Sequence, residues 1–219
     1  MSILDWYEEP IAKGHDRKSF DCGEPALNDY LKRHARNSHE RGGAKTFLAI
    51  SREDKKTILG FYSLSPASIE YSRVPGIVKR GLARHDVPVF RLGRLAVNLV
   101  VQNRRLGGQF LLSAGRRCIL AAAEVGGVAM LIDAKDERVA SWYTSYGAVP
   151  MLDTPLSLYI WMLKNFSKIP YFPYIVGTRR SEPSISKGFQ QMMLLKNLSS
   201  RLLVLRKCAM NLEKSFVKV

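Results

Sequence analysis

Cysteine is scarce in this 219-residue sequence, and its few positions form no pattern. Cys22, Cys118 and Cys208 are far apart, contain no C-x-x-C pair and leave one thiol over. This spacing argues against a disulfide framework or a zinc site and favours a reducing compartment. The four histidines show no metal-ligand spacing either, so we expect no bound metal.

Long hydrophobic runs are also missing. The longest apolar stretch, residues 118–132, is too short to span a bilayer and contains Glu124. The N-terminal segment MSILDWYEEP is acidic and poor in apolar residues, which is unlike a signal peptide. We therefore expect a cytoplasmic protein that is not associated with a membrane.

Acidic residues are few relative to basic ones. The chain contains 19 Asp and Glu residues and 34 Lys and Arg residues, which gives a formal net charge of +15. Such an excess favours a polyanionic partner, because phosphates attract lysine and arginine and release counterions. Nucleic acid is the favoured partner, and the surface of a membrane is the alternative. The basic clusters that we expect to contact RNA contain Lys32, Arg33 and Arg36, Lys79 and Arg80, and Arg91 and Arg94.

Hydrophobic periodicity predicts strands first, followed by strand–helix–strand–helix–strand. The expected helices begin at Pro25, with an apolar stripe that includes Leu27, Tyr30, Leu31, His34 and Ala35, and cover 106–125 and 137–146, with Gly147 as a C-cap. The expected strands cover 45–50, 57–65, 68–71, 89–99, 128–133 and 157–163. This order predicts a mixed α/β (α+β) fold in which helices flank a central mixed sheet with one crossover unit.

The turn between strand 89–99 and helix 106–125 is rich in hydrogen-bond donors and glycine. Its residues are Gln102, Asn103, Arg104, Arg105, Leu106, Gly107 and Gly108. A helix N-terminus offers free N–H groups to an anion, and glycine lets the anion approach the backbone. Close helix–strand packing is the alternative reason for two glycines here. The turn matches neither a Walker loop nor a G-x-G-x-x-G fingerprint, which leaves other pyrophosphate carriers such as coenzyme A.

The segment LGRLAV (92–97), followed by QNRRLGG (102–108), resembles the acetyl-coenzyme A motif of the GNAT acetyltransferases, whose loop has the pattern Q/R-x-x-G-x-G/A. Other stretches resemble more narrowly the GNAT-type toxins of bacterial toxin–antitoxin pairs. These stretches are FDCG with LNDYL, GFYSL, residues 136–143 with Gly147, and PLSL. The resemblance implies a GNAT domain over residues 1–164. Residues 165–219 form a linker and a basic amphipathic extension without a functional explanation.

The family resemblance implies an acetyltransferase that uses acetyl-coenzyme A to acetylate the α-amino group of aminoacyl-tRNA and so blocks translation. It also implies neutralisation by a ribbon-helix-helix antitoxin, and we expect a homodimer. The alternatives are a GNAT enzyme acting on a protein lysine or a small amine, and a catalytically silent module that binds nucleic acid or an antitoxin.

The resemblance also implies roles for individual residues. A backbone N–H of Leu95, Ala96 or Val97 holds the thioester oxygen, and Tyr143, in the segment WYTSYG, protonates the leaving thiolate. The coenzyme lies against those strand residues, the loop from Gln102 to Gly108, and Asp136. Arg105 replaces the first loop glycine, and we expect it to have ordinary helical dihedrals and to add a cation beside the phosphates. Because strand 89–99 should be central and largely covered, Arg91 and Arg94 should not both be ordinary surface residues.

Overall fold

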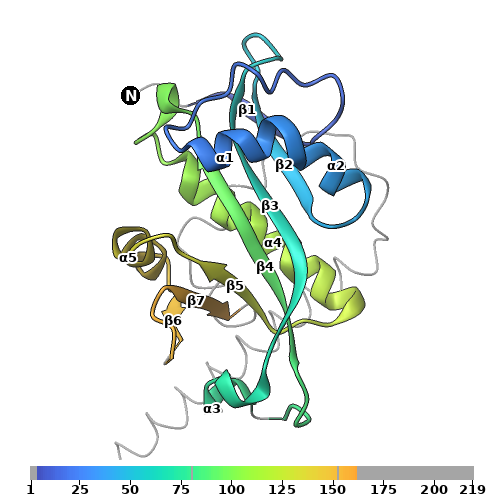
Figure 1. The fold of residues 1–219 in the computed structure, drawn as a ribbon, viewed down its shortest axis with the longest axis vertical. Coiled ribbons are helices and arrows are strands. Elements are labelled where there is room, and N and C mark those ends of the chain that lie inside the picture. Colours follow the sequence, from blue (N-terminus) through green and yellow to red (C-terminus); the bar gives the residue numbers. More distant parts are fainter. Residues whose placement is uncertain (1–3, 80, 152, 162–219) are drawn as a thin grey trace, which may run out of the picture. The chain divides into compact units, whose positions relative to one another are not determined.

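A seven-stranded mixed sheet organises the chain (Figure 1). The computed structural model describes residues 4–79, 81–151 and 153–161, so the expected C-terminal extension lies outside the described residues. The strands are β1 (Trp6–Pro10), β2 (Lys45–Ser51), β3 (Ile58–Ile69), β4 (Val87–Val97), β5 (Ala129–Asp133), β6 (Val149–Pro150) and β7 (Ser157–Trp161). They are ordered β1-β2-β3-β4-β5-β7-β6.

Only one pair of neighbouring strands in the described sheet is parallel. This pair is β4 and β5, and helix α4 (Leu106–Val125) connects the two strands. All other neighbouring pairs are antiparallel. The predicted mixed fold with one crossover unit is therefore confirmed, and the predicted bounds of α4 are those observed.

Strand β3 is longer than the sequence suggested. The two predicted strands at 57–65 and 68–71 form one strand of 12 residues, because its ladder with β4 continues from Gly60 to Ile69. Strands β1 and β6 were not predicted. β1 covers the edge of β2, and β6 has only two residues.

The first helix is interrupted by a turn of π-helix. It consists of α1 (Pro25–Asp29), the π-turn η1 (Tyr30–His34) and α2 (Ala35–Glu40). The N–H of Ala35 bonds to the C=O of Tyr30, five residues earlier. The extra residue in this turn rotates the following side chains around the helix axis. Tyr30, Leu31 and Ala35 are buried as predicted, whereas His34, which has the same helical spacing, has an exposed side chain.

The two faces of the sheet are covered differently. Helix α4 packs on one face, where Phe110 is fully buried, and α5 (Glu137–Ser145) borders the same core. On the other face, one apolar cluster lies beneath α1 and α2 and includes Phe61 and Ala96. A second cluster, which includes Val89, lies near α3 (Gly76–Lys79). Strand β4 runs from the region of α1 and α2 to the region of α3 (Figure 1).

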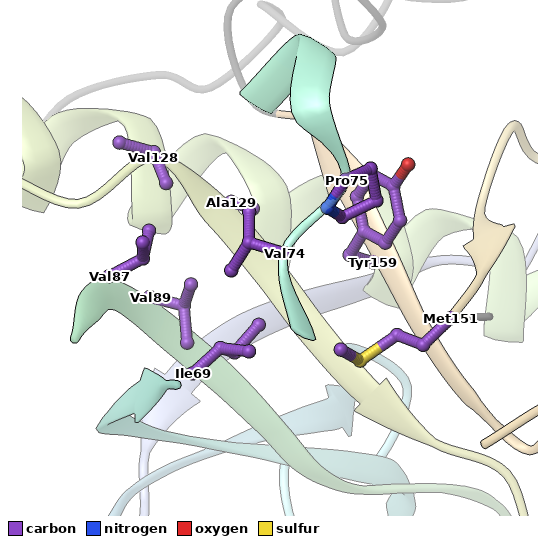
Figure 2. Close-up of a pocket in the computed structure, with 9 residues that line it drawn as sticks. All are labelled: Ile69, Val74, Pro75, Val87, Val89, Val128, Ala129, Met151 and Tyr159. Atoms are coloured by element: carbon purple, nitrogen blue, oxygen red, sulfur yellow. The ribbon is translucent and has the colours of Figure 1, made fainter. Parts of the chain in front are cut away.

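The cluster near α3 contains a small apolar pocket, shown in Figure 2. Its lining residues are Ile69, Val74, Pro75, Val87, Val89, Val128, Ala129, Met151 and Tyr159. The cavity measures about 10 Å³, which is room for one water molecule at most. It is therefore part of the packed core and not a substrate site. No helix among the described residues has both the length and the apolar character needed to cross a membrane.

Candidate active site

Strands β4 and β5 separate midway along β4. Their pairing ends at Leu92 and Ile132, whereas β4 continues for five residues to Val97. A β-bulge occurs at the point of separation. Ser63 pairs with Arg94 and the next residue, Leu64, pairs with Leu92, so Gly93 is the extra residue. Bulges bend a strand and increase its twist, and here the bend accompanies the opening between β4 and β5 (Figure 1).

The opening leaves backbone groups of β4 without a strand partner. The N–H of Asn98 donates to the C=O of Leu59 on the β3 side. Because backbone groups alternate along an antiparallel strand, Ala96 also faces β3, and Leu95 and Val97 direct their N–H groups into the opening. The side chain of Ala96 is buried beneath α1. Of the three predicted positions, Leu95 and Val97 therefore present their N–H groups to the opening, and Ala96 does not.

An open pocket of about 430 Å³ begins at this edge of β4. It brings together Tyr143 and most of the predicted coenzyme residues. Those residues are Leu95, Val97, Gln102, Asn103, Arg105, Leu106, Gly107 and Gly108. Four further lining residues were not predicted from the sequence: Val101, Val139, Trp142 and Tyr146. Val139, Trp142 and Tyr146 recur at helical spacing, and this was the signal that could have indicated a pocket wall, whereas Val101 gave no such signal.

The backbone of the loop before α4 differs from the expectation for Arg105. Arg105 precedes the first residue of α4 and is left-handed, with φ 63° and ψ 10°. The prediction of ordinary helical dihedrals is therefore wrong. Asn103 is also left-handed, with φ 62°. For a residue with a Cβ atom this conformation costs about 1–2 kcal/mol, and glycine, the family's residue at the position of Arg105, avoids that cost.

The two glycines of the loop have different surroundings. A Cβ atom on Gly107 would lie 3.5 Å from the ring of Trp142, an ordinary contact. A Cβ atom on Gly108 would lie 2.5 Å from the hydroxyl oxygen of Tyr146. Gly108 therefore allows close packing of α4 against Tyr146 at the end of α5, which is a contact with a helix and not the helix–strand packing named as the alternative. Of the two glycines, Gly107 has room for a small side chain.

Three predicted coenzyme residues have other structural roles or positions. The side-chain amide of Gln102 donates to the C=O of Cys22 at 3.0 Å and to the C=O of Val97 at 3.1 Å. It therefore ties the loop before α1 to the end of β4. Asp136 is the N-cap of α5, since its carboxylate accepts the N–H of Val139 at 2.8 Å. Arg104 is exposed and does not line the pocket.

Tyr143 occupies the wall of the pocket opposite β4. It is buried, with 7% of its surface exposed, and its ring packs edge-on against Trp142 at 4.8 Å. Burial raises the pKa of Tyr143 to about 12. The phenol is therefore protonated at neutral pH, as a proton donor must be.

Most of the predicted RNA-binding residues have partners within the chain. Arg33 pairs with Asp29 and Arg36 with Glu40, both at 2.8 Å. Lys79 donates to the C=O of Ser72 and lies over the ring of Tyr71. The pairs on the first helix are exposed, and such i,i+4 pairs contribute only about 0.3–0.5 kcal/mol. Lys32 is exposed as well, and Arg80 lies outside the described residues.

The expectation that Arg91 and Arg94 could not both be surface residues is wrong. Both are exposed, because the apolar clusters beneath α1 and near α3 leave the middle of β4 uncovered on that face. Arg91 pairs with Asp133 at 3.5 Å, and this acid is itself half exposed. Arg94 lies over the ring of Tyr30 at 3.7 Å.

Comparison with known proteins identifies the family. No family model matches the chain. A tRNA-acetylating toxin of Mycobacterium tuberculosis is 35% identical over 161 residues, which cover 73% of this chain and 95% of the relative. The chain belongs to the family of tRNA-acetylating toxins. Identity of this level over nearly the whole relative confirms the resemblance that the sequence motifs indicated.

Solved structures confirm the fold of this tRNA-acetylating toxin family member. The AtaT toxin in complex with acetyl-methionyl-tRNAfMet has a TM-score of 0.67 at 24% identity and covers 72% of this chain and 95% of its own. A tyrosine-to-phenylalanine mutant of AtaT, bound to the C-terminus of the antitoxin AtaR and to acetyl-CoA, has a TM-score of 0.62 at 24% identity. That match covers 72% of this chain and 94% of the AtaT chain. The GNAT fold is thus confirmed.

Proposed function

We propose that this enzyme transfers the acetyl group of acetyl-coenzyme A to the α-amino group of aminoacyl-tRNA and thereby blocks translation. The observation that carries the proposal is the unpaired edge of β4 at Leu95 and Val97, which opens into the pocket lined by Tyr143. An acyl transferase needs a donor for the carbonyl oxygen and an acid for the leaving group, and this pocket provides both.

The residues present fit acetyl-coenzyme A. The N–H groups of Leu95 and Val97 are available to polarise the thioester carbonyl oxygen. The N-terminal turn of α4 lines the same pocket, as do Arg105 and Gly107. The free N–H groups of this turn suit a pyrophosphate. Bound there, acetyl-coenzyme A would supply the activated acetyl group.

The chemistry requires few other side chains. A free α-amino group has a pKa of about 7.7, and esterification of the amino acid lowers it further, so the attacking amine is neutral without a strong base. The Tyr143 hydroxyl can donate a proton to the departing thiolate, because its own pKa of about 12 keeps it protonated. The phenol must then recover that proton, and the amine that loses one is its ultimate source.

The RNA partner is inferred from the charge of the chain and from its relatives. The +15 net charge favours a polyanion, and a relative of known structure binds an acetylated aminoacyl-tRNA. The cations on the first helix are proposed to hold phosphates of the acceptor stem, and they are the exposed Lys32 and Arg33 and the half-buried Arg36. Their weak pairs with Asp29 and Glu40 can exchange for phosphate at little cost.

An antitoxin partner, an oligomeric state and a cellular location can also be proposed for this chain. The AtaT structure with the C-terminus of AtaR supports an antitoxin partner for this chain. We propose a ribbon-helix-helix antitoxin, a homodimeric toxin and a cytoplasmic location.

Reaction with purified components tests the proposal. The enzyme, acetyl-coenzyme A and charged tRNA should yield N-acetylated aminoacyl ends, detected by mass spectrometry after nuclease digestion. Expression without an antitoxin should arrest bacterial growth, and charged tRNA from those cells should carry the same modification. Growth arrest with unmodified aminoacyl ends would refute the substrate assignment. A folded protein that shows no calorimetric binding of acetyl-coenzyme A would instead be the silent binding module.

A further inference from the structure

Arg94 differs from the other arginines near the active site. Its guanidinium carbon lies 3.7 Å from the centre of the Tyr30 ring. Arg33, Arg36 and Arg91 are each paired with a carboxylate. Arg94 has neither an ion pair nor a hydrogen bond from its side chain to any residue that the structure describes. It is thus held in place by an aromatic ring while its donors stay available.

The ring beneath Arg94 is firmly fixed. Tyr30 is 7% exposed, and its ring stacks on Phe61 with centroids 6.1 Å apart. Its hydroxyl is 3.5 Å from the hydroxyl of Thr46, which is also buried. At 3.7 Å the guanidinium rests on this ring, and because Arg94 is exposed, its opposite face is open to solvent. The result is a flat, charged surface with a rigid support.

The position of this surface relates it to the reaction. Arg94 directly precedes Leu95, whose N–H faces the opening between β4 and β5. Next to it, Gly93 is exposed and has no side chain. An amine that attacks an acetyl group held at Leu95 must approach within bonding distance of that group. In aminoacyl-tRNA, only the aminoacyl ester separates this amine from the ribose of the 3′-terminal nucleotide. The terminal nucleotide therefore lies within reach of Arg94.

We propose that the Arg94–Tyr30 stack is a platform for the 3′-terminal base of aminoacyl-tRNA, with the base stacked on the open face of the guanidinium. This inference rests on the proposed function. Proteins bind unpaired bases by stacking them on aromatic rings and arginine planes. All tRNAs end in the same nucleotide, so the platform would serve any aminoacyl-tRNA. It would position the α-amine at β4 without contacting the amino acid.

Three acceptors of increasing size test this inference. They are an amino acid methyl ester, the same amino acid on the 3′ oxygen of adenosine, and the whole aminoacyl-tRNA. Base stacking is worth about 1–3 kcal/mol per base, so Arg94→Ala should lower kcat/KM roughly 5- to 150-fold for the adenosine ester and the tRNA. The methyl ester, which has no base, should react at an unchanged rate.

Arg94→Lys separates stacking from charge. Lysine keeps the charge but has no plane, so it should not restore activity with the adenosine ester, which carries no phosphate. An effect that is confined to the whole tRNA and rescued by lysine would make Arg94 a phosphate contact and overturn the proposal. An unchanged kcat/KM with the adenosine ester would also overturn it. So would an equal loss with the methyl ester, since that indicates general damage to the site.

The chain provides a matched control. Arg52 lies over the ring of Tyr7 at 5.4 Å and pairs with Asp5, at the β1–β2 edge of the sheet. Arg52→Ala removes an arginine from a tyrosine ring in the same way, and it should leave kcat/KM unchanged for all three acceptors. If the wild-type enzyme acetylates the methyl ester but neither nucleotide substrate, the proposed function itself is wrong, which is a different result from failure of the platform.

Discussion

The hydroxyl of Tyr146 on α5 packs against the bare α-carbon of Gly108 on α4, where an added Cβ atom would lie only 2.5 Å from the hydroxyl oxygen. Gly108→Ala should therefore push the two helices apart and lower the free energy of unfolding by about 1–3 kcal/mol, the usual range for overpacking. Thermal or urea unfolding measures this change. Gly107→Ala is the matched control, since its Cβ atom would meet Trp142 at 3.5 Å, and it should be close to neutral in stability.

A second substitution distinguishes the contact with Tyr146 from a backbone effect. Combining Gly108→Ala with Tyr146→Leu removes the ring that the new methyl group would meet. The double variant should lose less stability than the sum of the two single variants. Additive losses would show that Tyr146 is not the obstacle at Gly108.

Replacement of Tyr143 by phenylalanine should separate binding from chemistry. The ring stays packed against Trp142, so the fold and the Kd for acetyl-coenzyme A should be retained. The proton donor is lost, and kcat should fall by ~10²–10⁴, the range for general acid catalysis. Single-turnover kinetics with charged tRNA measures this effect. Near-normal turnover by the variant would remove Tyr143 from the mechanism.

The pH dependence follows from the raised pKa of Tyr143. Burial shifts that pKa from 10.0 to about 12, so the acid stays protonated well above neutrality. Activity should rise as the substrate amine loses its proton and should not fall again below pH 10. A hydrolysis-resistant amide analogue of the aminoacyl ester allows the measurement at alkaline pH. A descending limb near pH 8 that is absent from a Tyr143→Phe variant would contradict this assignment.

The same shift affects stability with a definite sign. The unfolded state releases the phenol proton above pH 10.0, whereas the folded state retains it to about 12. The wild type should therefore lose stability relative to Tyr143→Phe as the pH rises through this window, and not below it. Urea unfolding at several pH values provides the measurement.

Arg105 allows backbone strain to be separated from charge. Both Arg105→Gly and Arg105→Ala remove the cation, but only glycine adopts φ 63° without a Cβ penalty. The glycine variant should be more stable than the alanine variant by about 1 kcal/mol. If the cation contacts the coenzyme phosphates, the Kd for acetyl-coenzyme A should rise to the same extent in both variants. Equal stability of the two variants would mean that the loop relaxes away from the left-handed conformation.

Substitution of Gln102 should weaken the binding of aminoacyl-tRNA more than the binding of acetyl-coenzyme A. Its amide joins the C=O groups of Cys22 and Val97, and Cys22 lies in the loop that leads into α1. Gln102→Glu replaces the donor with an acceptor that repels both carbonyls. It should raise the KM for aminoacyl-tRNA and change the Kd for acetyl-coenzyme A little. A change confined to coenzyme affinity would restore the role that the motif suggested for this residue.

The sequence predicted elements whose pattern is local. Helix α4 has its predicted bounds because apolar residues recur along it at helical spacing, and Tyr143 reached the pocket because the WYTSYG segment is specific. Strand β1 escaped prediction, since its segment WYEEP shows no clear alternation and its pairing partner begins 35 residues later, at Lys45. Tyr62 and Arg117 both donate hydrogen bonds to Glu8, and Arg117 also donates to the Tyr62 hydroxyl. These contacts could not be predicted for the same reason, because they join residues 54–109 positions apart.

The backbone conformation of Arg105 and the exposure of two arginines on β4 were not predicted correctly. The loop pattern that this chain resembles has glycine at the position of Arg105, and glycine readily adopts φ > 0. That glycine was the available signal for a left-handed residue, and the arginine in its place concealed it. The exposure of Arg91 and Arg94 could not be foreseen either. The sequence places them on a central strand, and only the three-dimensional arrangement shows that this part of the sheet is left uncovered.

The single extra residue at Gly93 reverses the alternation of side chains along β4. Before it, odd-numbered positions such as Val89 and Arg91 face away from α4, and after it the even-numbered Arg94 and Ala96 do so. Removing this one residue would turn Arg94 toward α4 and Leu95 toward Tyr30, which exchanges the acceptor side and the coenzyme side of the strand. The number of residues at the bulge therefore decides which side chains of β4 face each side of the sheet. Insertions or deletions there should reduce activity more than substitutions of single side chains on β4.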